Sequence, residues 1–525
     1  MMLHSRHCAA GLVLACCASL LASAQTAPPP PDLDATVQRC LETFHVPGMA
    51  VAIVKDGKVV VAKGYGVRKL GEATPVDENT LFGIGSNTKA FTTAALAILI
   101  DEKKLAWDDP VQKHLPWFQL YEPYVTRELT VRDLLTHRSG LGLGAGDLMY
   151  FPASTFSREE ILRRMRYIKP ASSFRSKYAY DNALYMAAGM IIPAITGKSW
   201  DEFVRERIFR PLGMTTSNTS VRDLATARDV ATAHTELDGK LTAVDFGGID
   251  NIGPAGAINS SVAEMAKWVV VQLNRGQIPG GPRLFSEARS REMWTGQTIL
   301  PINDPPAPLA RLKPSFAEYG LGWSLRDYAG HKLVGHSGGV KGFVTRVLLV
   351  PDQQFGVIVL TNAEEGGAYE AIAQHVLAYY LHLPPNDWVE AYKLVRDKQV
   401  ADAQATEAKA AGARAADSRP SLPLPRYAGA YSDAWYGPAT LQMQGSKLLL
   451  SFEHSPTMVG ELEHWQYDTF KTHWRDRSIP DAFVTFALKP DGSVDHFTML
   501  PVSALADFSY DYQDLWFTPA AAKNP

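Results

Sequence analysis

The chain has 525 residues, of which 46% are hydrophobic and 20% are charged, and its formal net charge is −3 with an isoelectric point near 6.5. This composition is typical of a globular protein, and the length indicates two or three domains. A near-neutral chain has no polyelectrolyte character, so we expect no nucleic-acid partner.

The first residues have the pattern of a secretory signal peptide. Arg6 precedes the apolar run 8–21, and Ala22 to Ala24 form a small-residue cleavage site. We therefore expect residues 1–24 to be removed after Ala24, which predicts a periplasmic or secreted protein. A lipoprotein signal ending at Cys16 is the alternative. The apolar run is too short for a membrane anchor, so the mature chain should have no membrane span.

The stretch 81–100 is the most informative part of the sequence. It carries the only S-x-x-K pattern of the chain, Ser86 and Lys89, at the entrance to an apolar run without Gly or Pro. Such a run predicts a buried helix. Residues i and i+3 share one helix face, so the hydroxyl and the amine should meet. A buried lysine has a lowered pKa and is suited to activate a serine nucleophile. A capping serine followed by an exposed lysine is the structural alternative.

The elements around this helix suggest a sheet that both ends of one segment build. The patterns predict helices at 33–44, 89–100, 130–137, 159–167, 182–196, 261–274 and 371–381, and hairpins at 49–62 and 344–361. Strand signals are sparse between 108 and 265. We therefore expect an antiparallel sheet with helices on it and a mainly helical insertion.

The end of the chain has a different pattern. Residues 402–417 are rich in alanine and charge, and three prolines follow, which predicts a linker. Short strands are then expected at 440–443, 447–453, 459–465, 469–474, 482–489, 495–500 and 508–517. We predict domains at 25–395 and 426–525, joined by a linker at 396–425. The second should be a small all-β barrel.

Two more polar patterns follow Ser86. Tyr180 and Asn182 open the helix at 182–196, and the glycine-rich stretch 335–339 contains His336 and Ser337. A tyrosine before a helix is usually a packing residue, and a lone histidine is usually structural. The glycines would let a substrate approach the backbone closely.

Together these segments resemble the serine β-lactamase and penicillin-binding protein superfamily, in the branch of class C β-lactamases, DD-peptidases, D-aminopeptidases and CubicO-type peptidases and esterases. The similar segments are 86–89, 105–116, 130–141, 180–182, 211–214, 319–323 and 336–338. They follow the order of the family, which makes the combination specific although each segment is weak. The resemblance implies an α+β fold of the β-lactamase/transpeptidase type. The final segment resembles the lipocalin-like β-domain of some relatives.

The resemblance also implies a role for each residue. Ser86 would be the acylated nucleophile, and Lys89 the general base or the group that keeps Tyr180 ionised. His336 would polarise the site or pass a proton to the leaving group. Substrate would bind at Asn182, Ser337 and Gly338, and the backbone N–H groups of Ser86 and Gly339 would form the oxyanion hole. The resemblance implies no metal and no cofactor.

One departure from the family pattern narrows the activity. Efficient class C β-lactamases carry a K-T-G motif, where this chain has His336. A neutral imidazole binds a carboxylate poorly, so we expect a hydrolase of small peptides, amides or esters, with D-amino acids among the candidates. A penicillin-binding protein or a weak β-lactamase is the alternative. The sequence gives no prediction of oligomeric state.

Two other interpretations remain at the sequence level. The stretch 335–339 also matches G-x-S-x-G, the nucleophile elbow of α/β-hydrolases, which would make Ser337 the nucleophile. That elbow leads from a strand into a helix, whereas the residues after it here predict two strands. The other interpretation is a non-catalytic binding homologue, although all the polar residues of the site are present.

Overall fold

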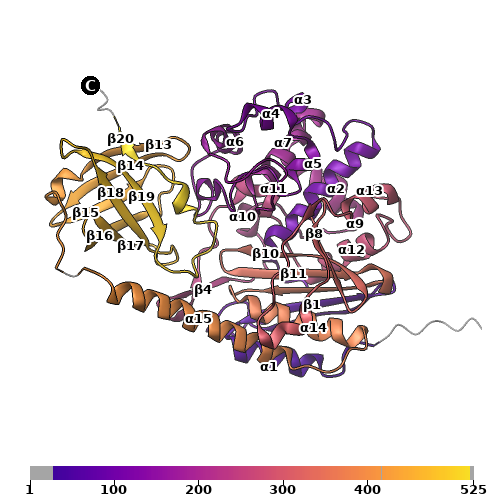
Figure 1. Cartoon of the computed structure of the whole chain (residues 1–525). Coiled ribbons are helices and arrows are strands. Elements are labelled where there is room, and N and C mark those ends of the chain that lie inside the picture. The colour runs from indigo at the N-terminus through magenta and orange to yellow at the C-terminus, as the bar shows by residue number, and fades with distance from the viewer. Residues whose placement is uncertain (1–27, 416, 521–525) are drawn as a thin grey trace, which may run out of the picture.

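An eight-stranded antiparallel sheet is the framework of the larger part of the molecule (Figure 1). The computed structural model describes residues 28–415 and 417–520, so the predicted signal segment 1–24, with Cys16, lies outside the described residues. The strand order is β2-β1-β12-β11-β10-β9-β8-β7. The strands are β1 (Gly48–Lys55), β2 (Lys58–Gly66), β7 (Thr298–Ile299), β8 (Ala317–Tyr319), β9 (Ser324–Tyr328), β10 (His331–Val340), β11 (Phe343–Val350) and β12 (Phe355–Thr361).

Both predicted hairpins are present, and β1 pairs with β12 along seven residue pairs. The beginning and the end of this part of the chain therefore meet in the middle of the sheet, as the sequence suggested. Strands β1 and β12 are apolar on both sides and almost fully buried, which requires a layer of helices on each face.

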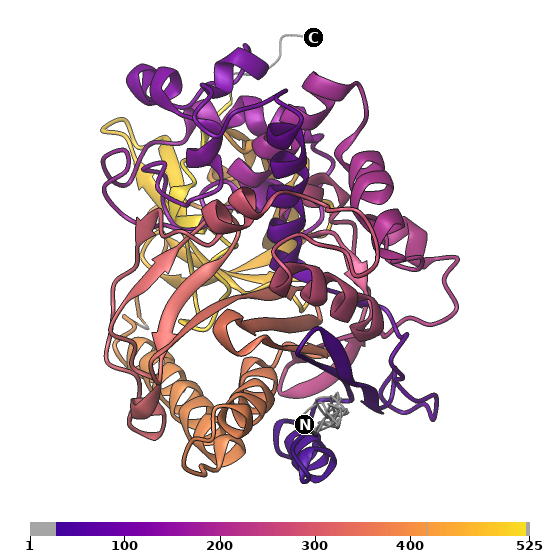
Figure 2. The ribbon, with the colours of Figure 1, turned by 90° about the vertical axis from the view of Figure 1, so that its right-hand side faces the viewer.

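Helices cover the two faces of the sheet (Figure 2). On one face lie α1 (Leu33–Phe44) and α14 (Gly366–Tyr380), which pack on each other. Helix α14 contacts β11 and β12, and α1 contacts β2. The opposite face carries α12 (Val262–Leu273), which contacts β1, β2 and β12, and α2 (Thr88–Asp101). Helix α2 is buried along nearly its whole length, because helices of the insertion surround it.

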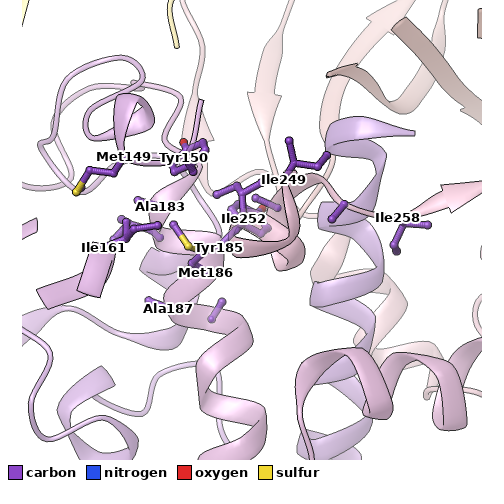
Figure 3. Packing of buried hydrophobic residues seen from close by; sticks show 14 of the residues in the cluster. Met149, Tyr150, Ile161, Ala183, Tyr185, Met186, Ala187, Ile249, Ile252 and Ile258 are labelled. Carbon is purple, nitrogen blue, oxygen red and sulfur yellow. The ribbon is translucent and has the colours of Figure 1, made fainter. Parts of the chain in front are cut away.

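The insertion packs around α7 (Ala183–Thr196), whose Tyr185, Met186 and Ala187 meet residues such as Ile161 and Ile252 in a dense apolar layer (Figure 3). The remaining helices of this part are α3 (Val111–His114), α4 (Pro123–Glu128), α5 (Val131–Leu134), α6 (Arg158–Arg164), α8 (Trp200–Val204), α9 (Arg210–Leu212), α10 (Val221–Leu224), α11 (Gly253–Gly256) and α13 (Glu287–Met293). Two small sheets complete it, formed by β3 (Phe82–Gly83) with β6 (Asn259–Ser260) and β4 (Ala233–Leu237) with β5 (Lys240–Val244).

The helix predicted at 130–137 is much shorter than expected. Thr130 and Asp133 form a capping box that starts α5, but the helix ends at Leu134. His137 then adopts a left-handed backbone conformation with φ of 54°, which an α-helix does not tolerate.

A second sheet of eight strands forms a nearly closed barrel beside the first part of the molecule. Helix α15 (Trp388–Gly412) leads to it and crosses residue 395, so the division into domains at 395 and 425 stays a prediction. Residues Phe497 and Phe517 exchange two backbone hydrogen bonds, which brings the two ends of the barrel sheet together. The strands are β13 (Gly429–Asp433), β14 (Gly437–Gln444), β15 (Lys447–Phe452), β16 (Val459–Gln466), β17 (Thr469–Trp474), β18 (Ala482–Leu488), β19 (Val494–Pro501) and β20 (Thr518–Pro519).

The strand predicted at 508–517 is wrong. These residues form turns and a short 3₁₀ helix, Tyr512–Asp514, before β20. Their alternating aromatic and polar residues imitate a strand, but the Phe508 and Tyr510 side chains pack against the other part of the molecule. Tyr510, for example, packs against Phe151 with ring centroids 5.1 Å apart.

The structure confirms the predicted fold class: an α+β fold of the β-lactamase/transpeptidase type, followed by a small all-β barrel. Within residues 28–415 and 417–520, every helix is too short or too polar to cross a bilayer. Cys40 is buried in α1, and burial raises its thiol pKa to about 12, which fits a packing residue.

Candidate active site

Ser86 and Lys89 lie at the junction of a tight turn and helix α2. Ser86 belongs to the 3₁₀ turn Gly85–Asn87, and Lys89 is in the first turn of the helix. Gly85 has a positive φ of 53°, a conformation that glycine adopts without strain. The Lys89 Nζ lies 3.0 Å from the Ser86 Oγ. The two predicted residues therefore meet, as their spacing indicated.

Tyr180 is the second neighbour of the serine. Its hydroxyl donates a hydrogen bond to the Ser86 Oγ at 2.7 Å. The residue lies in the loop before α7, where its carbonyl accepts from the Gly144 N–H. Its ring packs against the His137 imidazole, with ring centroids 4.3 Å apart. Burial raises the pKa of Tyr180 well above its ordinary value, so its hydroxyl keeps its proton.

The Lys89 amine is fully buried and held by polar groups that carry no net charge. Besides Ser86, it donates to the Asn182 Oδ1 at 2.7 Å and to the Ala255 carbonyl at 3.1 Å. Burial lowers the pKa of Lys89 to about 7, against the opposing effect of the Asp147 and Asp181 carboxyl groups. A large fraction of the amine is therefore neutral near neutral pH and is able to accept a proton.

His336, Ser337, Gly338 and Gly339 lie on strand β10, beside the serine turn. A Cβ atom on Gly338 would lie 2.0 Å from the Ile84 carbonyl oxygen, and one on Gly85 would lie 2.6 Å from the Gly339 nitrogen. The strand and the turn therefore touch through their backbones. This contact brings the N–H groups predicted for the oxyanion hole into the same region, because Ser86 and Gly339 line one cavity.

Both ring nitrogens of His336 have partners in the protein. The Nδ1–H donates to the Ser337 carbonyl, and the Nε2 accepts from the Tyr319 hydroxyl at 2.9 Å. Burial lowers the pKa of His336 to about 3, so the imidazole is neutral throughout the physiological range. The predicted role of His336 in polarising the site or passing a proton stays a prediction.

The position of Ser337 argues against the nucleophile-elbow interpretation. Ser337 lies within β10 and pairs with Arg346 of β11, in an antiparallel hairpin. A nucleophile elbow requires a sharp turn from a strand into a helix, whereas β10 is followed directly by strand β11. The α/β-hydrolase reading of residues 335–339 is therefore wrong.

Asp147 is a buried residue of the site that sequence reasoning missed. Its Oδ2 accepts from the Asn182 Nδ2 at 2.9 Å, while its Oδ1 has no hydrogen-bond partner. Burial, with a further contribution from the Asp511 carboxylate, raises the pKa of Asp147 well above its ordinary value. A single aspartate in the glycine-rich loop 140–147 carries no recognisable motif, so only the three-dimensional contacts identify it.

A cavity of about 790 Å³ opens at Ser86, and both parts of the molecule form its wall. The larger domain supplies one side of the wall. Its lining residues include Ser86, Tyr180, Asn182 and His336, together with Tyr150, Phe151 and Tyr178. The barrel supplies the other side through residues 477–480 and 505–510. Phe508 packs edge-on against Tyr180, with ring centroids 5.8 Å apart. Among the described residues, no group of three or more His, Cys, Asp or Glu side chains has the arrangement of a metal site.

Sequence comparisons match the chain to known families. The model of the Beta-lactamase family matches residues 33–381, and that of a domain of unknown function (DUF3471) matches residues 413–519. An unguisins hydrolase, ungD', of Aspergillus campestris is 31% identical over 438 residues, which cover 80% of this chain and 79% of that protein. Protein flp of Staphylococcus aureus strain N315 is 28% identical over 340 residues, covering 63% of this chain and 62% of that protein.

Solved structures share the fold. The octameric penicillin-binding protein homologue from Pyrococcus abyssi has a TM-score of 0.59 at 24% identity and covers 90% of this chain and 98% of its own. A D-stereospecific amidohydrolase from Streptomyces has a TM-score of 0.52 at 20% identity and covers 66% of this chain and 98% of its own. With the family model matched over most of the larger domain, the chain belongs to the β-lactamase family and is a serine hydrolase.

Proposed function

We propose that this chain is a secreted serine hydrolase that cleaves small peptides, amides or activated esters through an acyl-enzyme on Ser86. The observation that carries the proposal is the double contact at the Ser86 hydroxyl, with the Lys89 amine at 3.0 Å and the Tyr180 hydroxyl at 2.7 Å. A serine hydroxyl becomes a good nucleophile only when a neighbour takes its proton. The contacts supply that neighbour.

Of the two candidate bases, the chemistry favours Lys89. The Tyr180 hydroxyl donates a hydrogen bond to the Ser86 Oγ, and burial keeps the pKa of Tyr180 high. Tyr180 is therefore a phenol rather than a phenolate. Lys89 has a pKa of about 7 and is partly neutral at physiological pH. A neutral amine has a lone pair for the serine proton.

The proposed reaction then follows the acyl-enzyme route. The Ser86 Oγ attacks the substrate carbonyl carbon while its proton moves to the Lys89 Nζ, and the N–H groups of Ser86 and Gly339 hold the oxyanion. The bond to the leaving group breaks, and that group takes the proton from the Lys89 Nζ, while the Tyr180 hydroxyl is a hydrogen-bond donor beside the Ser86 Oγ. Water then attacks the ester carbon and gives a proton to the Lys89 Nζ. As the bond from the carbon to the Ser86 Oγ breaks, Lys89 returns this proton to the Oγ, which releases the acid and restores the hydroxyl.

The remaining predicted residues would bind substrate. Asn182 uses one Nδ2 hydrogen for Asp147, which leaves the second for a substrate carbonyl. Ser337 and Gly338 would lie along the bound chain on β10. His336 is neutral and engaged on both nitrogens, so of its two predicted roles we propose that it polarises the site rather than transfers a proton.

Small peptides or amides are the proposed substrates because of the size and charge of the site. A cavity of about 790 Å³ is in the range that holds a drug-sized molecule. A neutral His336 stands in place of the K-T-G lysine, so this position offers no cation to a β-lactam carboxylate. The name of the Streptomyces amidohydrolase makes D-amino-acid amides the first candidates, and a lipocalin-like barrel that limits substrate length is part of the proposal.

The test compares p-nitrophenyl acetate hydrolysis by the wild type, Ser86→Ala and Ser337→Ala, with folding checked by circular dichroism. We expect Ser86→Ala to lose roughly three orders of magnitude or more in kcat, because the covalent nucleophile is gone. In Ser337→Ala, kcat should fall about tenfold at most, because the variant loses a single hydrogen bond to the substrate. Full activity of Ser86→Ala would refute the proposal. If Ser86→Ala is inactive, a panel of D- and L-amino-acid amides defines the substrate of the wild type.

Penicillin provides the test of the alternative. A stable penicillin adduct on Ser86, seen by intact mass, together with no turnover of any amide or ester, would favour a penicillin-binding protein. N-terminal sequencing of the exported protein tests secretion, for which we expect a mature chain that begins at Gln25. A lipid-modified cysteine at position 16 would support the lipoprotein alternative.

A further inference from the structure

We propose that the barrel domain takes part in catalysis, because Ser509 and Asp147 are positioning residues for the Lys89 amine. Ser509 belongs to the barrel segment 505–510 that lines the cavity. Its hydroxyl contacts Asp147, which is linked to Lys89 through the Asn182 side chain. This inference rests on the proposed function, since it assigns Lys89 the role of the base.

The contacts form a continuous chain from one domain to the nucleophile. The Ser509 Oγ donates to the Asp147 Oδ2 at 2.9 Å, and the Asn182 Nδ2 donates to the same oxygen at 2.9 Å. The Asn182 Oδ1 accepts from the Lys89 Nζ at 2.7 Å, and that amine lies 3.0 Å from the Ser86 Oγ. The Asp147 Oδ2 therefore accepts both from the barrel residue Ser509 and from Asn182, the residue that holds the Lys89 amine.

Asp147 determines which way the Asn182 amide points. An amide has a donor end and an acceptor end, and a lysine amine requires the acceptor end. Because the Asp147 Oδ2 accepts from the Asn182 Nδ2, it holds the amide N–H₂ on its own side and turns the Asn182 Oδ1 toward Lys89. The reversed amide would place donors against the amine and an oxygen against the carboxyl group. Without Asp147, the amide has no reason to keep the orientation that holds the amine.

Asp511 fixes the position of Ser509 relative to Asp147. The buried Asp511 carboxylate accepts backbone N–H groups from Gly146 at 2.7 Å and Leu148 at 3.1 Å, the two residues that flank Asp147. Gly144 allows the close approach, because a Cβ atom there would lie 2.7 Å from the Phe508 carbonyl oxygen. The barrel segment is thus docked on the loop that carries Asp147, and the Ser509 hydroxyl is placed by that docking.

The position of Asp147, and the Ser509 hydroxyl that donates to it, predict an effect on turnover rather than on substrate binding. Asp147 does not line the cavity, so its removal leaves the wall that a substrate touches intact. What changes is the fraction of time that the amine spends at the Ser86 Oγ. Misplacement of a catalytic group by a fraction of an ångström lowers kcat, whereas KM changes little when substrate contacts are kept.

The experiment measures kcat and KM for p-nitrophenyl acetate with full-length Ser509→Ala, Ser509→Thr, Asp147→Ala, Asp147→Asn and the double variant of the two alanines. Ser503→Ala is the matched control, since this serine lies in the same loop and its Oγ only accepts from the Leu505 N–H. Thermal unfolding of each variant separates loss of fold from loss of position.

We expect Ser509→Ala and Asp147→Ala to lower kcat roughly tenfold or more with KM within about twofold, as the loss of hydrogen bonds to a charged or buried group predicts. Ser509→Thr keeps the hydroxyl and Asp147→Asn keeps an acceptor, so both should recover most of the activity. The double variant should be no slower than Asp147→Ala, because Ser509 acts through Asp147.

Three results would overturn the inference: Ser509→Ala matching Ser503→Ala in kcat, losses that multiply in the double variant, or a loss that Ser509→Thr does not restore. Ser86→Ala keeps this test distinct from that of the function. If Ser86→Ala is inactive while Ser509→Ala is normal, only the positioning role fails. If Ser86→Ala is active, the proposed function itself fails.

Discussion

At the scale of single residues, the site depends on burying a lysine beside neutral partners. A buried ammonium is costly unless an anion pairs with it, and Lys89 is hydrogen-bonded to a hydroxyl, an amide oxygen and a carbonyl instead. The cost of charging the amine appears as its lowered pKa of about 7. The same burial keeps Tyr180 protonated and His336 neutral, so of these three residues Lys89 is the one whose charge changes near neutral pH.

The first prediction concerns the pH dependence of the reaction. Because the neutral amine is the active form, kcat/KM for an activated ester should rise with pH through a midpoint near 7, where Lys89 loses its proton. The profile is measured between pH 5 and 9, with tryptophan fluorescence as a control that the fold persists at low pH. A flat profile, or a midpoint near 4, would show that another group controls the rate.

At the scale of elements, activity depends on how closely strand β10 approaches the turn that carries Ser86. Gly338 faces the Ile84 carbonyl with no room for a side chain, whereas a Cβ atom on Gly339 meets nothing within 4 Å. The two neighbouring glycines therefore have different structural roles. The first permits the backbones to touch, and the second leaves open space at the oxyanion hole.

The second prediction uses this difference. Gly338→Ala should lower the free energy of unfolding by about 2 kcal/mol, because the strand and the turn must separate to admit the methyl group. It should also reduce kcat, since the turn carries the nucleophile. Gly339→Ala is the matched variant and should unfold like the wild type. Thermal unfolding of both variants provides the measurement, and equal stability of the two would contradict this account of the contact.

At the scale of the whole molecule, the barrel completes the site rather than standing apart from it. Helix α15 leads from the first part of the molecule to the barrel (Figure 1). Residues 505–510 of the barrel line the cavity at Ser86. Asp511 is the main polar contact of that docking, since its buried carboxylate satisfies two backbone N–H groups of the other domain. Buried donors left without an acceptor are costly, so this residue should matter to the joint stability of both parts.

The third prediction is that Asp511→Ala destabilises the protein by about 3 kcal/mol, because two backbone N–H groups lose their acceptor. Differential scanning calorimetry should show a lower or a split transition, as expected when two domains lose their coupling. Asp495→Ala serves as the control, because Asp495 lies on the barrel surface and pairs only with its neighbour His496. If both variants unfold alike, Asp511 does not hold the domains together.

The fold class and the contact between Ser86 and Lys89 could be predicted from the sequence. Hydrophobic periodicity marks strands and helices directly, so the hairpins, α1 and α7 were predicted close to their observed bounds. The contact between Ser86 and Lys89 is local, because residues three positions apart in a helix share one face and lie near each other. Tyr180 and His336 stood out only through the resemblance to the family, since nothing local links them to Ser86.

Only the tertiary structure decided which groups surround that pair. Asp147 lies 362 positions before Ser509 in the sequence, and Asp147, Ser509 and Asp511 match no motif. Their contacts therefore depend on how the two domains dock. The strand predicted at 508–517 failed for the same reason. An alternating pattern reports that one side of a segment is buried, but not whether a neighbouring strand or another domain buries it.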